Sequence, residues 1–224
     1  MTGTVAPSAN APKLSRQETK ERHALTRQLR KSLRERARGT GWGCARGCLF
    51  RNHQDWFVEV MPIVALNGFR THLRLLVKPM AIDPIFWQIV ALPENIRLPL
   101  SFRAAGAWTC HTYPIVETIL PDAEHRAETL ASLVLDWADK QLEQCGPHWT
   151  LNGFISGLQQ ANNGWDFASL VSALIVAGRN DEAMTTCLKA RPPGGDEYRA
   201  GGRSFTDLAV TYLVNASVSD AAED

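Results

Sequence analysis

The fold is decided by the stretch Trp56-Phe-Val-Glu-Val-Met-Pro-Ile-Val-Ala-Leu-Asn-Gly-Phe-Arg-Thr-His-Leu-Arg-Leu-Leu-Val-Lys78. At its centre stand Asn67 and Gly68, a pair typical of the two-residue type I′ turn, in which both central residues need a positive φ. After this pair, apolar and polar residues largely alternate up to Lys78, as in a strand with one buried face. The stretch therefore predicts an antiparallel β-hairpin with strands at residues 56–66 and 69–78.

A two-residue turn also fixes the register of the hairpin. It pairs residues of one face as follows: Val64 with Thr71, Val60 with Leu75, and Val58 with Val77. On the other face, Glu59 stands opposite Leu76. Pro62 would face Leu73 at a hydrogen-bonded position, where proline has no N–H to donate. The register therefore predicts a bulge or a local loss of pairing at Pro62.

Patterns on either side of the hairpin complete the sheet and the first helix. Ser15 can cap a helix that ends near residue 38, and its apolar residues recur every four positions: Leu25, Leu29, Leu33 and Ala37. Short apolar runs predict further strands at residues 48–51, 96–103 and 108–113. Residues 39–47 contain four glycines and are expected to form a flexible turn. The predicted class is α+β, with an N-terminal helix on an antiparallel sheet of about five strands, followed by an all-helical C-terminal half.

Capping residues and prolines predict the remaining helices. Asp83 and Pro84 start a helix that ends near residue 91, and Pro121 and Asp122 start a long one that ends near residue 144. Further helices are expected after Thr150 and at residues 166–177, 180–190 and 204–216. We divide the chain into a disordered tail (1–12), a helix plus antiparallel sheet (13–120), a helical half packed on it (121–216) and an acidic tail (217–224).

The charge of the chain is nearly balanced but unevenly distributed. The formal net charge is +1, yet residues 13–38 carry ten Lys or Arg and three Glu, while residues 121–224 carry seven basic and fifteen acidic residues. If the basic helix packs against the acidic half, this asymmetry is internal. If it does not, each end is a candidate partner surface.

The cysteine count and the N-terminal segment indicate the compartment. The five cysteines are an odd number, which is not the even set of a disulfide framework. The first dozen residues have no apolar core of a signal peptide, and no apolar run is long enough to span a bilayer. We expect a reduced, cytoplasmic protein with no membrane partner.

Two stretches resemble known families. The positions Phe167, Leu170, Leu174, Gly178, Ala183 and Ala190 look like one tetratricopeptide-type helical hairpin, with the turn at residues 178–183 carrying most of the likeness. The layout of helix and meander, together with Asp55-Trp-Phe-Val-Glu-Val60, resembles small domains found among immunity proteins of bacterial polymorphic toxins. This second resemblance implies a bacterial protein that acts by binding a partner protein.

Motifs that would indicate catalysis or a cofactor are missing from the sequence. It has no phosphate loop of the Walker type, no Gly-x-Ser-x-Gly elbow and no His-Glu-x-x-His, and we expect no cofactor. Four residues are weak candidates for zinc ligands, although free cysteines also pack as small hydrophobes: Cys44, Cys48, Cys110 and His111. Cys145 and His148 could pair as thiolate and imidazole, but the sequence suggests no third residue to orient them.

The outward face of the predicted sheet is the candidate binding surface. Its members are apolar side chains edged by charged ones: Phe57, Glu59, Met61, Arg70, His72, Arg74, Lys78, Arg97 and Arg103. Such a surface is typical of protein-binding faces. Two other interpretations stay open, because the basic side chains can simply be solvated, or the acidic helical half can cover the face.

Three functions follow from these observations. The leading hypothesis is a non-catalytic protein-binding module, such as a bacterial immunity or adaptor protein. The second is a nucleic-acid-associated regulator whose basic N-terminal helix contacts phosphates. The third is an enzyme of a type that the sequence does not reveal.

Overall fold

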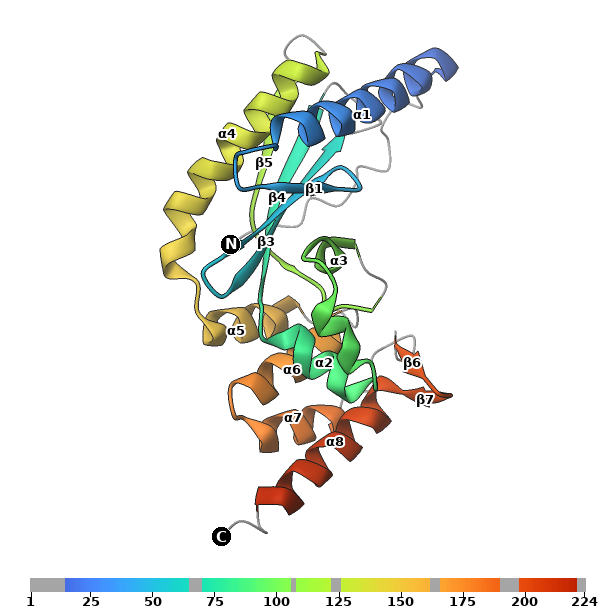
Figure 1. Cartoon of the computed structure of the whole chain (residues 1–224), viewed down its shortest axis with the longest axis vertical. Helices are drawn as coiled ribbons and strands as arrows, with labels where there is room; N and C mark the ends of the chain where they lie inside the picture. The colour runs from blue at the N-terminus through green and yellow to red at the C-terminus, as the bar shows by residue number, and fades with distance from the viewer. Residues whose placement is uncertain are drawn as a thin grey trace.

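The chain folds into an α+β structure whose upper part is a sheet covered by helices and whose lower part is helical (Figure 1). This computed structural model describes residues 15–64, 70–105, 108–121, 126–161, 166–189 and 198–220. The first described element, α1 (Arg16–Arg36), begins with a capping box. In it the Ser15 hydroxyl accepts the Glu18 N–H at 3.2 Å, and the Glu18 carboxylate accepts the Ser15 N–H at 2.8 Å. The predicted N-terminal helix is thus confirmed.

Five antiparallel strands follow one another in chain order across the main sheet of the described residues. They are β1 (Gly43–Ala45), β2 (Cys48–His53), β3 (Trp56–Val64), β4 (Arg70–Pro79) and β5 (Tyr113–Pro121). Strands β3 and β4 have the predicted register, with Val60 opposite Leu75 and Glu59 opposite Leu76. The turn at Asn67 and Gly68 lies outside the described residues.

The predicted bulge at Pro62 is wrong. Pro62 stays opposite Leu73, and the register runs on unbroken to Val64 and Thr71. A missing N–H removes one donor from the ladder but leaves the proline carbonyl able to accept, so the paired neighbours can hold the register. The irregularity lies instead between β4 and β5, where the register shifts between Leu75 and Leu76.

The predicted strands at 96–103 and 108–113 are also wrong. The first region forms η1 (Pro93–Arg97) and α3 (Ser101–Ala105), and Ile96 and Leu98 are exposed. The alternation of apolar and polar residues over 96–103 therefore does not reflect burial of the apolar ones. Pro93 and Pro99 also lack the N–H donors that a strand would need. The place beside β4 is taken by β5, a run rich in β-branched residues that starts where the second predicted strand ends.

The glycine-rich segment 39–47, expected to be a turn, contains β1. It pairs with β2 through a two-residue turn in which Arg46 and Gly47 have φ of 52° and 89°. A Cβ on Gly47 would lie 2.6 Å from the side chain of Arg30 on α1. Glycine is therefore needed here both for its backbone angle and for the close approach of α1.

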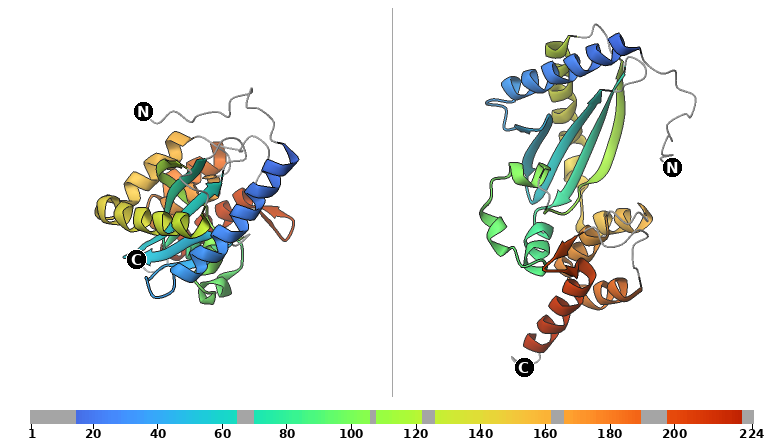
Figure 2. Two further views of the ribbon diagram at one scale, coloured as in Figure 1. Left: turned by 90° about the horizontal axis from the view of Figure 1, so that it is seen from above. Right: turned by 90° about the vertical axis from the view of Figure 1, so that its right-hand side faces the viewer.

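One face of the sheet, the inner face, is covered by α1 and by α4 (Ala127–Cys145), which also pack on each other (Figure 2). The inner face carries Val58, Val60, Leu73, Leu75 and Val77, all buried. A polar contact fastens α4 to this layer, since Trp42 donates its indole N–H to Asp139 at 2.8 Å. Helix α4 begins at Ala127, six residues after the predicted start.

The lower part of the molecule consists of short helices. They are α2 (Ile82–Ile89), η2 (Gly146–His148), α5 (Leu151–Ala161), α6 (Phe167–Val176), α7 (Asn180–Lys189) and α8 (Phe205–Asp220), with a small hairpin of β6 (Arg199–Ala200) and β7 (Arg203–Ser204). Helix α2 packs against α6 and α8 although it directly follows β4. The same hydrophobic core therefore runs from the sheet into the helices.

Candidate functional site

The outer face of the sheet, opposite α1 and α4, is where the predicted binding residues on β3 and β4 lie. Side chains alternate along a strand, so residues between the inner-face positions point to this side. It has two parts. The covered part consists of Phe50, Phe57, Glu59 and Lys78, and the open part of Met61, Ile63, Arg70, His72, Arg74, Glu117 and Ile119.

Burial removes several predicted residues from the candidate binding surface. Phe57, Glu59 and Lys78 are buried, because α3 packs against β1 and β2 and the chain after it passes over the end of β4. Arg103 lies in α3 rather than on a strand, and its side chain is only 10% exposed. Strand alternation put these four on one face and left open whether the acidic helical half covers it. The segment that covers it is α3 with residues 108–112.

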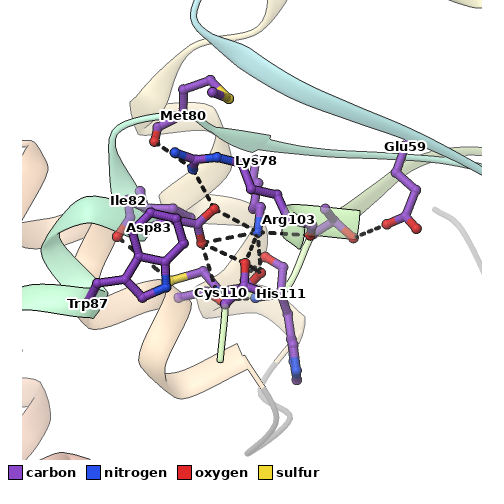
Figure 3. A network of polar contacts seen from close by, with 12 residues as sticks. Glu59, Lys78, Met80, Ile82, Asp83, Trp87, Arg103, Cys110 and His111 are labelled. Carbon is purple, nitrogen blue, oxygen red and sulfur yellow. Dashed lines mark hydrogen bonds and ion pairs between the residues drawn. The ribbon is translucent and has the colours of Figure 1, made fainter. Parts of the chain in front are cut away.

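A buried polar network fills the space under this covering segment (Figure 3). The Lys78 ammonium lies 3.0 Å from the Asp83 carboxylate and donates to the carbonyl of Cys110 at 2.7 Å and to the hydroxyl of Thr109. Asp83 also accepts from Arg103 at 2.6 Å, from the Thr109 hydroxyl at 2.9 Å and from the Cys110 N–H at 2.8 Å. One carboxylate thus holds two cations.

The network anchors the end of β4 to the start of α2 and to the covering segment. An ammonium has three N–H groups, and those of Lys78 are used by protein oxygens. The Asp83 carboxylate is likewise fully engaged. Because the Lys78 ammonium and the Asp83 carboxylate are both saturated by protein groups, we interpret these residues as a structural clamp.

Glu59 lies at the border between the covered and open parts. Thr112 donates to its carboxylate at 3.4 Å, and burial raises its pKa from 4.5 to about 7. Burial also raises the pKa of the neighbouring Cys48 thiol to about 12, and the charge of Glu59 acts in the same direction. A thiol held in its protonated form is a poor nucleophile, so the pair does not resemble an activated cysteine.

The open part places apolar side chains in solvent on a rigid sheet. Ile63 is 37% exposed and Ile119 is 47% exposed, and both stand level with His72 on the strand between them. The next row consists of Met61, Arg74 and Glu117, in which Arg74 and Glu117 form an ion pair of 2.9 Å. Arg70 is exposed at the same end of the sheet.

Three predicted or possible site residues lie elsewhere. Arg97 is exposed at the end of η1 and does not belong to the sheet. Cys145 ends α4 and is half-buried, whereas His148 is exposed at the end of η2. Neither makes a hydrogen bond to the other within the part of the chain that the structure describes, so they do not form the suggested pair.

The four weak candidates for metal binding are not brought together. Cys44 pairs with Leu49 and Cys48 with Ala45, which places the two cysteines on opposite faces of the β1–β2 hairpin. Cys110 is buried beside the Ile82 carbonyl, and His111 lies 3.7 Å from Asp166. Among the described residues no group of three or more His, Cys, Asp or Glu could hold a metal ion. Nor does any described helix combine the length and apolar character needed to cross a membrane.

Two groups of residues were missed by the sequence analysis. The clamp was missed because its members come from residues 78, 83, 103, 109 and 110, and Lys78 looks like an ordinary polar position of a strand. Glu117 and Ile119 were missed because β5 was not predicted over residues 113–121. The signal for β5 was present in the β-branched residues Ile115, Val116, Thr118 and Ile119.

Comparison of the chain with protein-family models, with curated protein sequences and with solved structures finds no match.

Proposed function

We propose that the protein is a non-catalytic binding module, of the immunity or adaptor kind, that binds a partner protein through the open part of the outer sheet face. The observation that supports this most is the pair Ile63 and Ile119, exposed on the same face of a five-stranded sheet. Apolar side chains that lie together in solvent, edged by polar ones, mark interaction sites in many proteins.

The open part has the rigidity that favours binding. Ile63 and Ile119 stand on paired strands whose backbone is already ordered, so binding orders few groups. Isoleucine is β-branched and loses little rotamer freedom on burial. An apolar centre whose side chains lose little conformational entropy on binding supports an interface of modest size.

The charges around the centre indicate the chemistry of the partner. Arg70 and Arg74 are exposed and His72 is half-buried, while the only acidic member, Glu117, is paired with Arg74. The open part is therefore basic at its rim. We expect a partner protein that presents an apolar centre flanked by carboxylates.

The test uses a matched pair of exposed isoleucines. A photo-crosslinking residue at position 119 identifies the partner in the native host, and the affinity of the purified pair is then measured by calorimetry. Ile119→Asp should weaken binding by at least about tenfold, which corresponds to about 1.4 kcal/mol. Ile96→Asp is the control, because Ile96 is exposed in η1, away from the sheet. Equal affinities for the two variants would contradict the proposal.

A second candidate function is favoured by the charges of α1. Arg27, Arg30 and Arg34 are exposed along it, and its glutamates are engaged within the helix, as Glu35 is with Lys31 at 4.0 Å. Such a cationic surface supports contacts to the phosphates of a nucleic acid. Binding to labelled DNA or RNA should then weaken steeply between 50 and 200 mM salt, as expected of roughly three or more phosphate contacts. Absence of binding at low salt would exclude this candidate.

A further inference from the structure

Helix α1 carries a line of cations along the side that faces away from the sheet. Positions spaced by three, four or seven residues lie on one side of an α-helix, because each turn takes 3.6 residues. Five exposed cations have this spacing, and we call them the basic stripe: Arg16, Lys20, Arg27, Arg30 and Arg34. The exposed His23 lies within it. The buried Leu25, Leu29 and Leu33 lie on the opposite side of α1, in the core.

The glutamates of α1 lie outside the basic stripe and are bound by other groups. Glu18 belongs to the capping box, and Glu21 accepts from Gln17 at 2.8 Å. Glu35 pairs with Lys31 at 4.0 Å. Among the described residues no ion pair engages a member of the basic stripe. From its first to its last member α1 rises about 27 Å, so the basic stripe is a continuous cationic surface of that length.

The basic stripe is held in place by the sheet beneath it. The methylene stem of Arg30 packs against Gly47 in the turn between β1 and β2, so closely that a Cβ on Gly47 would lie 2.6 Å from the Arg30 Cγ. Arg46 stands in the same turn and is exposed, which adds a sixth cation next to α1. Figure 1 shows α1 at the upper end of the molecule, far from the helical lower part. Its charges are therefore available to a large anionic partner.

We infer that the basic stripe binds double-stranded DNA through its phosphates, with the exposed side of α1 in the major groove. This inference rests on the second candidate function and names the nucleic acid and its contacts. The major groove of B-form DNA is about 12 Å wide and admits an α-helix, whereas the major groove of an RNA duplex is narrow and deep. Phosphates border the groove, and arginine and lysine side chains are long enough to reach them. Because phosphate contacts carry no base information, binding is expected to be independent of sequence.

The composition of α1 separates duplex DNA from two other polyanions. Proteins that bind single strands stack bases on aromatic side chains, and α1 has no Phe, Tyr or Trp. Helices that lie in a membrane surface bury an apolar side among the lipids. The apolar side of α1 is already buried in the protein core. A regular row of cations with neither feature fits a row of phosphates on a rigid duplex.

The DNA and the proposed partner protein would lie on opposite sides of the sheet. Helix α1 covers the inner face, and the basic stripe points away from that face. The open part lies on the outer face, around Ile63 and Ile119. One molecule can therefore hold both at once, and this arrangement suits an adaptor that brings a partner protein to DNA.

Fluorescence anisotropy of a labelled DNA duplex of about 16 base pairs, titrated with the full chain at several salt concentrations, tests the inference. Five phosphate contacts give a slope of about −4.5 for the logarithm of the association constant against the logarithm of the salt concentration. Arg27→Gln/Arg34→Gln should reduce this slope by about 2 and weaken binding at least about tenfold at about 0.1 M salt. Glutamine keeps a helix propensity close to that of arginine, and circular dichroism checks the helix content.

The matched control is Arg36→Gln/Arg97→Gln, which removes the same charge. Arg36 is exposed on the leucine side of α1, and Arg97 is exposed in η1, so the slope should stay that of the wild type. Equal slopes and affinities for the two double variants would overturn the basic stripe while leaving the nucleic-acid candidate with another surface. Absence of DNA binding at about 50 mM salt would overturn both.

Three competing ligands test the choice of DNA. They are an RNA duplex and a single DNA strand of the same sequence, and phosphatidylcholine vesicles with roughly one third phosphatidylserine. Tighter binding to any of them than to the DNA duplex would overturn the assignment. Ile119→Asp should leave DNA binding unchanged, and the variant of the basic stripe should leave binding of the partner protein unchanged. A DNA affinity that falls with Ile119→Asp would overturn the separation of the two surfaces.

Discussion

The covered and the open parts of the outer sheet face share strands β3 and β4 and differ in what lies above them. In the covered part, a lysine and a glutamate are buried under α3 and the chain that follows it. In the open part, two isoleucines are exposed to water. Charged side chains are thus buried in the covered part and apolar ones are exposed in the open part, the reverse of the usual pattern of burial. The difference shows that the burial of a strand position is set by segments far along the chain, and that a buried charge persists where a full set of partners is supplied.

The largest effect is expected from the carboxylate of the clamp. Asp83→Ala leaves Lys78 and Arg103 as neighbouring cations, one of them fully buried, so the free energy of unfolding should fall by about 3–5 kcal/mol. Lys78→Met should cost less, because the Asp83–Arg103 pair keeps its balance of charge. Urea denaturation of both variants measures the difference. A larger loss for Lys78→Met than for Asp83→Ala would contradict this account of the clamp.

Phe57 and Ile63 compare the two parts directly, since both lie on the outer side of β3. Phe57 is fully buried beneath the Lys78 ammonium, which lies 5.3 Å from the centre of its ring. Phe57→Ala should therefore lower the free energy of unfolding by about 3–5 kcal/mol. Ile63→Ala, in the open part, should lower it by about 1 kcal/mol or less. If urea denaturation gives similar decreases in the free energy of unfolding for the two variants, the contrast between a covered and an open part is contradicted.

Glu59, at the border between the two parts, should make the free energy of unfolding of the protein depend on pH. Its pKa of about 7 is above the ordinary value of 4.5, so the folded state binds more protons than the unfolded state between these two values. The contribution of Glu59 to stability is therefore complete below pH 4.5 and falls as the pH rises through 7, by on the order of 3 kcal/mol.

Glu59→Gln should remove this dependence. The stability of the variant relative to the wild type should rise between pH 5 and pH 8, as measured by thermal or urea unfolding at each pH. Glu117→Gln, in the open part, is the control, because the side chain of Glu117 is 54% exposed. A relative stability of Glu59→Gln that does not change with pH would contradict the assignment.

The smallest effect is expected for the ion pair of the open part. Arg74 and Glu117 are both about half exposed, so their coupling in a double-mutant cycle should be about 0.2–1 kcal/mol and should decrease with salt. A coupling above about 2 kcal/mol would indicate that this pair is shielded from water.

The hairpin was predictable from the sequence because its signals are local. Asn67 and Gly68 indicate a turn, and alternation indicates two strands, so the register of β3 and β4 follows without other information. Helices with capping residues, such as α1 after Ser15, were predictable for the same reason. Alternation failed at residues 96–103, where the apolar positions Ile96 and Leu98 are exposed.

The candidate site was only partly predictable. Met61, Arg70, His72 and Arg74 were correctly placed on the outer face, because their positions follow from the hairpin alone. Lys78 and Glu59 were placed on the same face, but whether that face is covered stayed open, since the covering residues 103–105 and 108–112 come later in the chain. The apolar centre of the open part needed Ile119, which depends on recognising β5.

Strand β5 also bears on how the protein avoids aggregation. It is the last strand of the sheet, so one side of its backbone has no neighbouring strand within the described residues. Pro114 and Pro121 lack N–H donors near its two ends, and the shift of register beside Leu75 disturbs its regularity. The opposite edge, β1, has three residues. The short β1 and the prolines and Glu117 of β5 hinder pairing with another chain, so the sheet can keep isoleucines in water with little tendency to grow into fibrils.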